Sequence, residues 1–201
     1  LLADDVLALM DSLKIDRAVL VGHSMGGYVT LAFARAYPHR LSGLGFIASH
    51  AAADTLEQRQ NRLKAVDKIK RHGIGFLVED MAGKLTSKQE LMEPLKAIMR
   101  ETNPLGVIGA LKAMGDRPDS LEYLPAIKAP ALVLAGSQDK IMPLERAQTL
   151  AQLLPRGWMV EVPDAGHMPM METPETVAAA LRELIQSAKN YRPSADINGL
   201  E

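Results

Sequence analysis

Three residues of this chain, Ser24, Asp139 and His167, have the types and positions that nucleophilic catalysis requires. A serine hydroxyl is a poor nucleophile at neutral pH, so it needs a base within hydrogen-bond reach. That base needs a further group to fix its tautomer and to stabilise its cation. The three residues supply one candidate for each role, and they follow one another in the order serine, aspartate, histidine.

Ser24 lies in the most informative motif of the chain, residues 22–26, which read GHSMG and match the pattern G-x-S-x-G. The apolar run before it, residues 18–21, is typical of a buried strand. Residues 27–37 after it have apolar side chains near helical spacing, and Pro38 follows them. A strained strand-to-helix turn at this point would lift the Ser24 hydroxyl clear of a sheet.

The other two candidates each follow a predicted strand. Asp139 comes shortly after the strand at residues 131–135, and His167 comes after the strand at residues 159–162. Ligand sites in open parallel sheets lie beyond the carboxyl ends of the strands. We therefore expect the three side chains to converge on one edge of the sheet.

Two further carboxylates compete with Asp139 for the role of the acid. Asp54 comes after another predicted strand, and Asp164 lies shortly before His167. Asp139 is favoured because it follows the strand that precedes the histidine in the chain.

Strand patterns alternate with helix patterns around these residues. A second buried strand is predicted at residues 41–48, and helices are predicted at residues 143–154 and 173–189. An amphipathic helix opens the chain. This alternation predicts an α/β fold with a mostly parallel sheet that is covered by helices on both faces.

One long segment differs from this pattern. Residues 54–122 contain charged helical stretches broken by glycines and prolines, and they show no strand-like alternation. We interpret them as an inserted helical cap. The core then comprises residues 1–53 and 123–189, and residues 190–201 form a polar, frayed tail.

The composition narrows the classes of partner. The 201 residues carry a net charge of −1 and have no basic patch, which argues against nucleic acid or an anionic membrane as the main partner. The chain has no cysteine, so disulfides and thiolate metal sites are excluded. It has no apolar run of membrane-spanning length and no secretory signal, which favours a cytoplasmic protein. Nothing in the composition selects an oligomeric state.

Four segments together resemble the α/β-hydrolase superfamily: residues 22–27, 134–143, 165–167 and 172–174. Within it, the chain is similar to the capped esterase and lactonase branch, which includes enol-lactone hydrolases and carboxylesterases. The resemblance covers nearly the whole chain and is looser in the helical insert. It implies hydrolysis of a small carboxylic ester or lactone, without a cofactor or a metal.

The resemblance also implies a role for each motif residue. Ser24 is the nucleophile, His167 is the general base and then the general acid, and Asp139 orients it. The backbone N–H of Met25 is one donor of the oxyanion hole, because it opens the helix after the nucleophile. A carbon–carbon bond hydrolase or a cofactor-free perhydrolase would use the same three residues. A non-catalytic binder with this fold is the alternative from another class.

Other residues near the predicted strand ends have lesser roles. We expect His50, just past the second strand, and Met168, beside His167, to line the substrate pocket. His23 is expected to pack inside the turn, and Glu172 to support the start of the last helix.

One part of the family pattern is not found before Ser24. The second oxyanion N–H comes from a loop after an early strand, often marked by His-Gly, and this chain begins inside a predicted helix. We therefore predict that the chain is the carboxy-terminal part of a longer hydrolase whose early strands are missing here. The strand before Ser24 would then have one unpaired edge.

Overall fold

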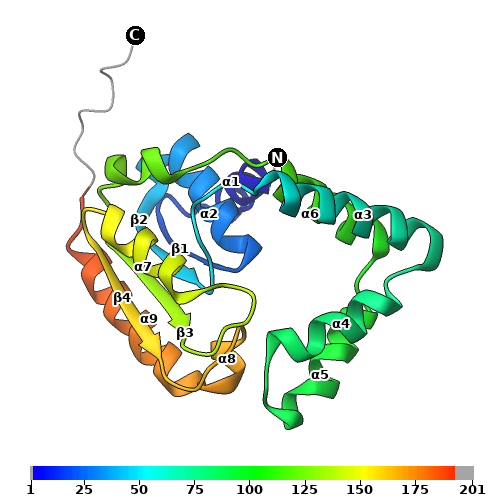
Figure 1. The fold of residues 1–201 in the computed structure, drawn as a ribbon. Coiled ribbons are helices and arrows are strands. Elements are labelled where there is room, and N and C mark those ends of the chain that lie inside the picture. The colour runs from blue at the N-terminus through cyan, green and yellow to red at the C-terminus, as the bar shows by residue number, and fades with distance from the viewer. Residues whose placement is uncertain (1, 193–201) are drawn as a thin grey trace.

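The central element of the fold is a sheet of four parallel strands in the order β1-β2-β3-β4 (Figure 1). The computed structural model describes residues 2–192 of the chain. The predicted α/β architecture with a parallel sheet is confirmed. The strands are β1 (Ala18–His23), β2 (Leu41–Ile47), β3 (Ala131–Gly136) and β4 (Gly157–Val162).

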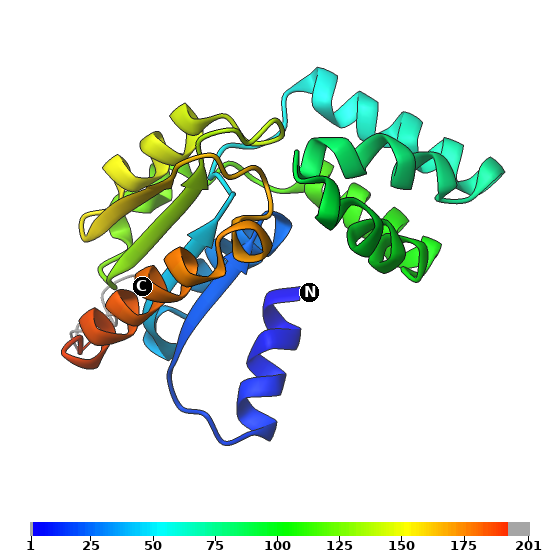
Figure 2. The same ribbon diagram turned by 90° about the horizontal axis from the view of Figure 1, so that it is seen from below.

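Helices cover both faces of this sheet, as the alternating pattern predicts. The helices on one face are α1 (Leu2–Ser12), α2 (Met25–Ala36) and α7 (Leu144–Leu153), and their apolar side chains share one core cluster with the sheet. The helix on the other face is α9 (Pro174–Lys189), which packs on β2 and β3. Figure 2 shows α9 lying along the sheet on the side away from α7.

Strand β3 explains why the sequence of this sheet reads as continuous apolar runs. Its residues Ala131, Val133 and Ala135 face the cluster with α2 and α7, while Leu132 and Leu134 face the cluster with α9. All six residues of β3 are buried. A parallel strand covered on both faces needs apolar side chains at every position, not at alternate ones.

The register of the sheet brings the strand ends level. His23 at the end of β1 pairs with Ile47 at the end of β2, and Ile47 pairs with Leu134 in β3. Gly136 at the end of β3 pairs with Val162 at the end of β4. The loops that follow these strands therefore leave the sheet along the same edge.

The chain forms the cap between β2 and β3, within the predicted insert of residues 54–122. Helix α3 packs against α6, and α4 packs against α5 (Figure 1). A capping box between Thr55 and Gln58 starts α3, and the Asn103 side chain caps α6. The cap helices are α3 (Leu56–His72), α4 (Gly75–Leu85), α5 (Gln89–Arg100) and α6 (Pro104–Asp116).

An ion-pair cluster lies where the chain enters the cap and where it leaves the cap. We call its residues, Asp54, Arg62 and Arg117, the hinge. Arg117 Nη1 lies 2.7 Å from Asp54 Oδ1, and Arg62 Nη2 lies 3.2 Å from the same oxygen. Arg117 also donates to the carbonyls of Ala52 and Met114. Burial raises the pKa of Asp54, but the hydrogen bonds and charges of the two guanidinium groups outweigh burial and hold that pKa below its ordinary value.

The two ends of the described chain lie on the core. Among residues 2–192, no strand pairs with the outer edge of β1, where Val21 is 38% exposed. Tyr191 packs against the core between Arg17 and Arg156. The rest of the predicted tail, residues 193–201, lies outside the described residues.

Candidate active site

Ser24 occupies a strained turn between β1 and α2. Its φ is 50° and its ψ is −114°, and the left-handed φ is unfavourable for a residue with a side chain. Two contacts from the β2 side hold it there. The Ser24 N–H donates to the Ile47 carbonyl at 2.8 Å, and the Ser49 hydroxyl donates to the Ser24 carbonyl at 2.9 Å.

Two glycines of the motif make this turn possible by close approach. A Cβ added at Gly22 would lie 2.2 Å from the carbonyl of Gly26, and one added at Gly27 would lie 2.2 Å from the Ser49 hydroxyl. Neither space admits a side chain. The strand and the helix can therefore meet at this angle only with glycine at both positions.

The structure brings the three predicted side chains together. His167 Nε2 lies 2.9 Å from Ser24 Oγ, and His167 Nδ1 lies 2.8 Å from Asp139 Oδ2. The other oxygen of Asp139 accepts from the backbone N–H groups of Ile141 and Met142, at 2.8 and 2.9 Å. A carboxylate accepts hydrogen bonds, so Nδ1 of His167 carries the proton and Nε2 is free to accept from Ser24.

The competing carboxylates lie in other environments. Asp54 belongs to the hinge, where two arginines bind it. Asp164 is exposed and accepts from the side-chain amide of Gln138 at 3.1 Å. Of the three carboxylates, Asp139 is the one that contacts His167.

His23 has a contact that the sequence analysis did not foresee. Its Nε2 donates to the backbone carbonyl of His167 at 2.8 Å, and the two ring centroids lie 5.0 Å apart. Burial is the largest cause of the lowered pKa of His23. The residue before Ser24 therefore holds the backbone of His167.

A backbone N–H without a partner in its own helix lies at the start of α2. Met25 is the first residue of this helix, and the first N–H groups of a helix have no partner within it. They also lie at the positive end of the helix dipole. The Met25 N–H can therefore bind a negative charge that forms next to Ser24.

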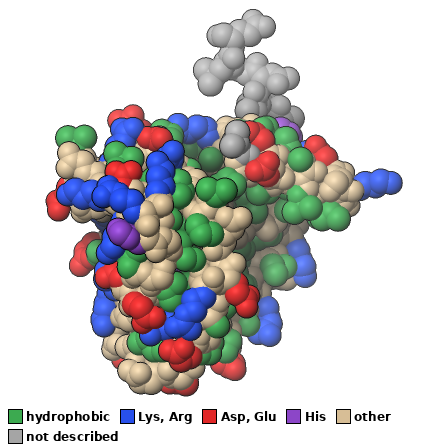
Figure 3. Space-filling model, turned by 90° about the vertical axis from the view of Figure 1, so that its right-hand side faces the viewer, with side chains coloured by type: hydrophobic (Ala, Val, Ile, Leu, Met, Phe, Trp, Pro, Cys, Tyr) green, Lys and Arg blue, Asp and Glu red, His purple; other side chains and the backbone are tan. Residues whose placement is uncertain are grey.

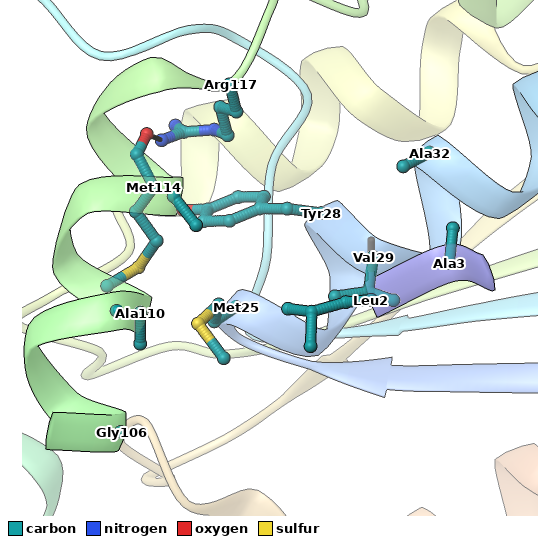
Figure 4. Close-up of a pocket in the computed structure, with 12 residues that line it drawn as sticks. Leu2, Ala3, Met25, Tyr28, Val29, Ala32, Gly106, Ala110, Met114 and Arg117 are labelled. Atoms are coloured by element: carbon teal, nitrogen blue, oxygen red, sulfur yellow. Dashed lines mark hydrogen bonds between the residues drawn. The ribbon is translucent and has the colours of Figure 1, made fainter. Parts of the chain in front are cut away.

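A cavity of about 530 Å³ opens beside Met25, between the core and α6 (Figure 4). Its wall on α2 includes Met25, Tyr28 and Val29. Its wall on the cap is mostly small or flexible, because α6 contributes Gly106, Gly109, Ala110, Ala113 and Met114. Such a cavity accommodates an apolar group of modest size.

The two residues expected to line the pocket do not line this cavity. His50 is 5% exposed and lies behind Tyr28, with the two ring centroids 5.3 Å apart. Its Nε2 accepts from Arg146 at 3.2 Å, so the side chain points into the protein. Burial, and then the charges of Arg146 and Arg117, lower the pKa of His50 from its ordinary 6.5 to about 4. Met168 follows His167 in the chain and is the N-cap residue of the short helix α8 (Pro169–Glu172).

The surface charges, the candidate metal ligands and the lengths of the helices complete the description of the site. Figure 3 shows basic and acidic side chains interspersed over the cap face. Within residues 2–192, no group of three or more His, Cys, Asp or Glu side chains could hold a metal ion. None of the described helices is long and apolar enough to cross a membrane.

Comparisons with known proteins agree with this fold. A family model described as the alpha/beta hydrolase fold matches residues 1–174. A thermophilic esterase from Thermogutta terrifontis is 39% identical with a TM-score of 0.89, over 92% of this chain and 71% of that protein. The enol-lactonase from Burkholderia xenovorans is 25% identical with a TM-score of 0.83, over 92% and 71%. The 2-hydroxy-6-oxononadienedioate/2-hydroxy-6-oxononatrienedioate hydrolase of Paraburkholderia phymatum is 30% identical, over 83% and 62%.

Proposed function

The chain belongs to the α/β-hydrolase family, and we propose that it is a serine hydrolase that cleaves a small carboxylic ester or lactone through an acyl-enzyme. The observation that carries the proposal is the contact of His167 Nε2 with Ser24 Oγ at 2.9 Å, with Asp139 on the opposite ring nitrogen. The relatives named as an esterase and an enol-lactonase support the choice of substrate class.

In the acylation step, Ser24 Oγ attacks the carbonyl carbon of the substrate and its proton passes to His167 Nε2. The carbonyl oxygen becomes an oxyanion, to which the Met25 N–H donates. Asp139 stabilises the imidazolium. His167 then returns the proton to the alcohol oxygen as the C–O bond breaks, which leaves the acyl group on Ser24.

In the deacylation step, water gives a proton to His167 Nε2 and attacks the acyl carbon. The bond to Ser24 Oγ breaks, and the serine takes the proton back from His167. An ester thus yields an acid and an alcohol, whereas a lactone yields one hydroxy acid. Neither step requires a cofactor or a metal.

The cavity supports a small and mainly apolar substrate. It begins at Met25, next to the nucleophile, and its cap wall on α6 is formed by small residues. Because Met25, the residue after Ser24, lines the cavity, we place either the acyl or the alcohol part of an ester in it. A small-molecule ester or lactone is therefore the proposed partner, and a cytoplasmic location remains a prediction.

A fluorophosphonate probe and a panel of short p-nitrophenyl esters and small lactones test the proposal in the protein expressed from its complete reading frame. The wild type is expected to take up the probe and to turn over at least one substrate class. Ser24→Ala should do neither. The control is Ser12→Ala, because Ser12 is exposed and its hydroxyl bonds only to the Leu9 carbonyl. A folded wild type that ignores both probe and panel would contradict the proposal.

A second candidate is a carbon–carbon bond hydrolase that uses the same three residues. One relative is named for a hydroxy-oxo-dienedioate, which is a keto diacid and not an ester. Cleavage of such keto acids with no turnover of esters or lactones would favour this candidate. Turnover of peroxide with a carboxylic acid would indicate a perhydrolase, and tight binding without turnover would indicate a binder.

A further inference from the structure

The cap meets the core a second time, at the loop that bears His167. The loop between α4 and α5 lies against the turn before α8, which Figure 1 shows facing the α4–α5 pair. The His167 N–H donates to the Leu85 carbonyl at 3.0 Å. The proposed base of the core is therefore hydrogen-bonded directly to the cap.

A buried carboxylate strengthens this contact. Glu172 is 6% exposed, and its two oxygens have different donors. One oxygen accepts from the Gly166 N–H, next to His167, and the other accepts from the hydroxyl of Thr86 in the cap. Thr86 is itself 2% exposed. The Glu172 side chain therefore bridges the cap and the His167 loop, whereas the sequence analysis expected it to support the last helix.

Lys88 completes the contact, and we call Thr86, Lys88 and Glu172 the clamp. The Lys88 ammonium donates to the Glu172 backbone carbonyl, and the Lys88 N–H donates to the Thr86 hydroxyl at 3.1 Å. Each partner of Glu172 matters because a buried carboxylate is costly unless hydrogen bonds satisfy its oxygens. Loss of the cap partner would leave one oxygen of Glu172 unsatisfied or hydrated.

The space around Gly166 is an independent sign that the clamp is tightly fitted. A Cβ added at Gly166 would lie 3.2 Å from Glu172 Oε1 and 3.2 Å from the Leu85 carbonyl oxygen. The backbone before His167 is thus enclosed between the clamp carboxylate and the cap. A shift of the cap loop removes one wall of this enclosure.

Hydrogen bonds to the backbone of His167 link the cap to the turn that contains Ser24. The His167 N–H binds the cap, and its carbonyl accepts from His23, the residue before Ser24. We propose that Thr86 and Glu172 are positioning residues: docking of the cap loop on Glu172 sets His167 at the distance and angle from which it deprotonates Ser24. This inference rests on the proposed function.

Variants that change only the hydroxyl of Thr86 test the inference most directly. Thr86→Val removes the donor to Glu172 with little change of shape, and Thr86→Ser keeps the donor. Thr102→Val is the matched control, because Thr102 lies in the cap, is exposed, and its hydroxyl bonds only within the cap, to the Ile98 carbonyl. We expect Thr86→Val to lower kcat and the rate of fluorophosphonate labelling by about 10- to 100-fold, because small misplacements of a catalytic group have effects of this size. KM for a small ester should change little.

A measurement on the histidine itself separates positioning from mere stabilisation of the cap. The Nδ1 proton between His167 and Asp139 gives a downfield proton resonance, which should shift or broaden in Thr86→Val but not in Thr86→Ser or Thr102→Val. The inference is overturned if this resonance and kcat stay unchanged in Thr86→Val, even if its melting temperature falls. A resonance that depends on Thr86 in a wild type without esterase activity would instead overturn the proposed function and leave the clamp standing.

Discussion

Among the described residues, two hydrogen-bonded contacts between the cap and the core are built from different chemistry. The hinge binds the buried carboxylate of Asp54 with two guanidinium groups. The clamp binds the buried carboxylate of Glu172 with a backbone N–H and a hydroxyl. A buried ion pair is hard to open because its separated charges lose their partners. The Lys88 ammonium of the clamp binds a backbone carbonyl and not this carboxylate. The neutral donors of Glu172 are easier to exchange for water, so breaking the clamp and breaking the hinge should have different consequences.

The hinge and the clamp also differ in their positions. The hinge joins the chain segments that enter and leave the cap, and Arg117 reaches backbone carbonyls on both segments. The clamp lies at the far end of the cap, next to His167. We therefore expect damage at the hinge to lower the free energy of unfolding and damage at the clamp to lower the rate of reaction.

The largest loss of kcat should come from a variant in which Asp139 no longer orients His167. No clamp variant should lower kcat by more than this. Asp139→Asn can keep the bonds from Ile141 and Met142 while its amide N–H₂ faces His167 Nδ1. The proton then moves to Nε2, which can no longer accept from Ser24, and kcat should fall by about 10⁴-fold. Steady-state kinetics check this, with Asp164→Asn as the control. If Asp139→Asn lowers kcat less than Thr86→Val does, the clamp affects His167 more strongly than Asp139 does, which contradicts the prediction.

The next effect tests the hinge. Arg117→Met leaves Asp54 with Arg62 alone and removes the bonds to Ala52 and Met114. We expect the free energy of unfolding in urea to fall by about 3 kcal/mol, since breaking a buried pair leaves a poorly compensated charge. Arg117 also lines the cavity, so KM for a small ester is expected to change, whereas kcat in the folded protein should stay within about threefold, well short of the change expected at the clamp.

A matched ion pair in the same cap controls for the loss of an arginine. Arg59 pairs with Asp116, and their side chains are 54% and 64% exposed. Arg59→Met should therefore cost less than about 1 kcal/mol. If it costs as much as Arg117→Met, burial is not what distinguishes the hinge.

A third prediction concerns α6, which lies between the two contacts and forms a wall of the cavity. A Cβ at Gly109 would meet no atom within 4 Å, so a larger side chain there extends into the cavity. Gly109→Leu should lower kcat/KM for a hexanoyl ester relative to an acetyl ester by about 10- to 100-fold. Gly83→Leu is the control, because Gly83 is also open but does not line the cavity. If kcat/KM falls equally for both esters, the acyl group does not occupy this cavity.

The last prediction is a pH dependence of stability beside the hinge. His50 has a folded-state pKa of about 4, below its ordinary 6.5, because of burial and of the charges of Arg146 and Arg117. Between these pH values the unfolded chain binds a proton at His50 that the folded protein does not, so the free energy of unfolding should fall as pH drops from 6.5 to about 4. The loss is complete below the folded pKa.

Urea unfolding at several pH values measures this slope. His50→Gln removes the titrating group, so the decline between pH 6.5 and about 4 should be shallower than in the wild type. Parallel curves for the two proteins would show that His50 is protonated as readily in the fold as in the unfolded chain.

The sequence predicted those parts of the site that depend on local patterns. Ser24, Asp139 and His167 each follow a strand, and parallel strands place their following loops on one edge whatever the rest of the chain does. The apolar run of β3 and the glycines around Ser24 leave little freedom in the backbone. Strand ends could therefore be placed from the sequence without knowledge of distant contacts.

The direction of a side chain and the pairing of residues far apart in the chain could not be predicted from local sequence patterns. His50 does follow a strand, but a strand-end position does not reveal whether the side chain faces the cavity or Arg146. Thr86 and Glu172 are 86 residues apart, and Arg117 and Asp54 are 63 apart. Such contacts depend on how the cap docks, and the periodicity of single helices does not contain that information.

The left-handed backbone of Ser24 has a consequence for how this chain can change over generations. A glycine at this position would relax the turn, and relief of such strain is worth about 1–3 kcal/mol. If Ser24 is the nucleophile, selection for stability and selection for reactivity act in opposite directions on one codon. A descendant without need of this hydroxyl could then drift to glycine here and melt at a higher temperature.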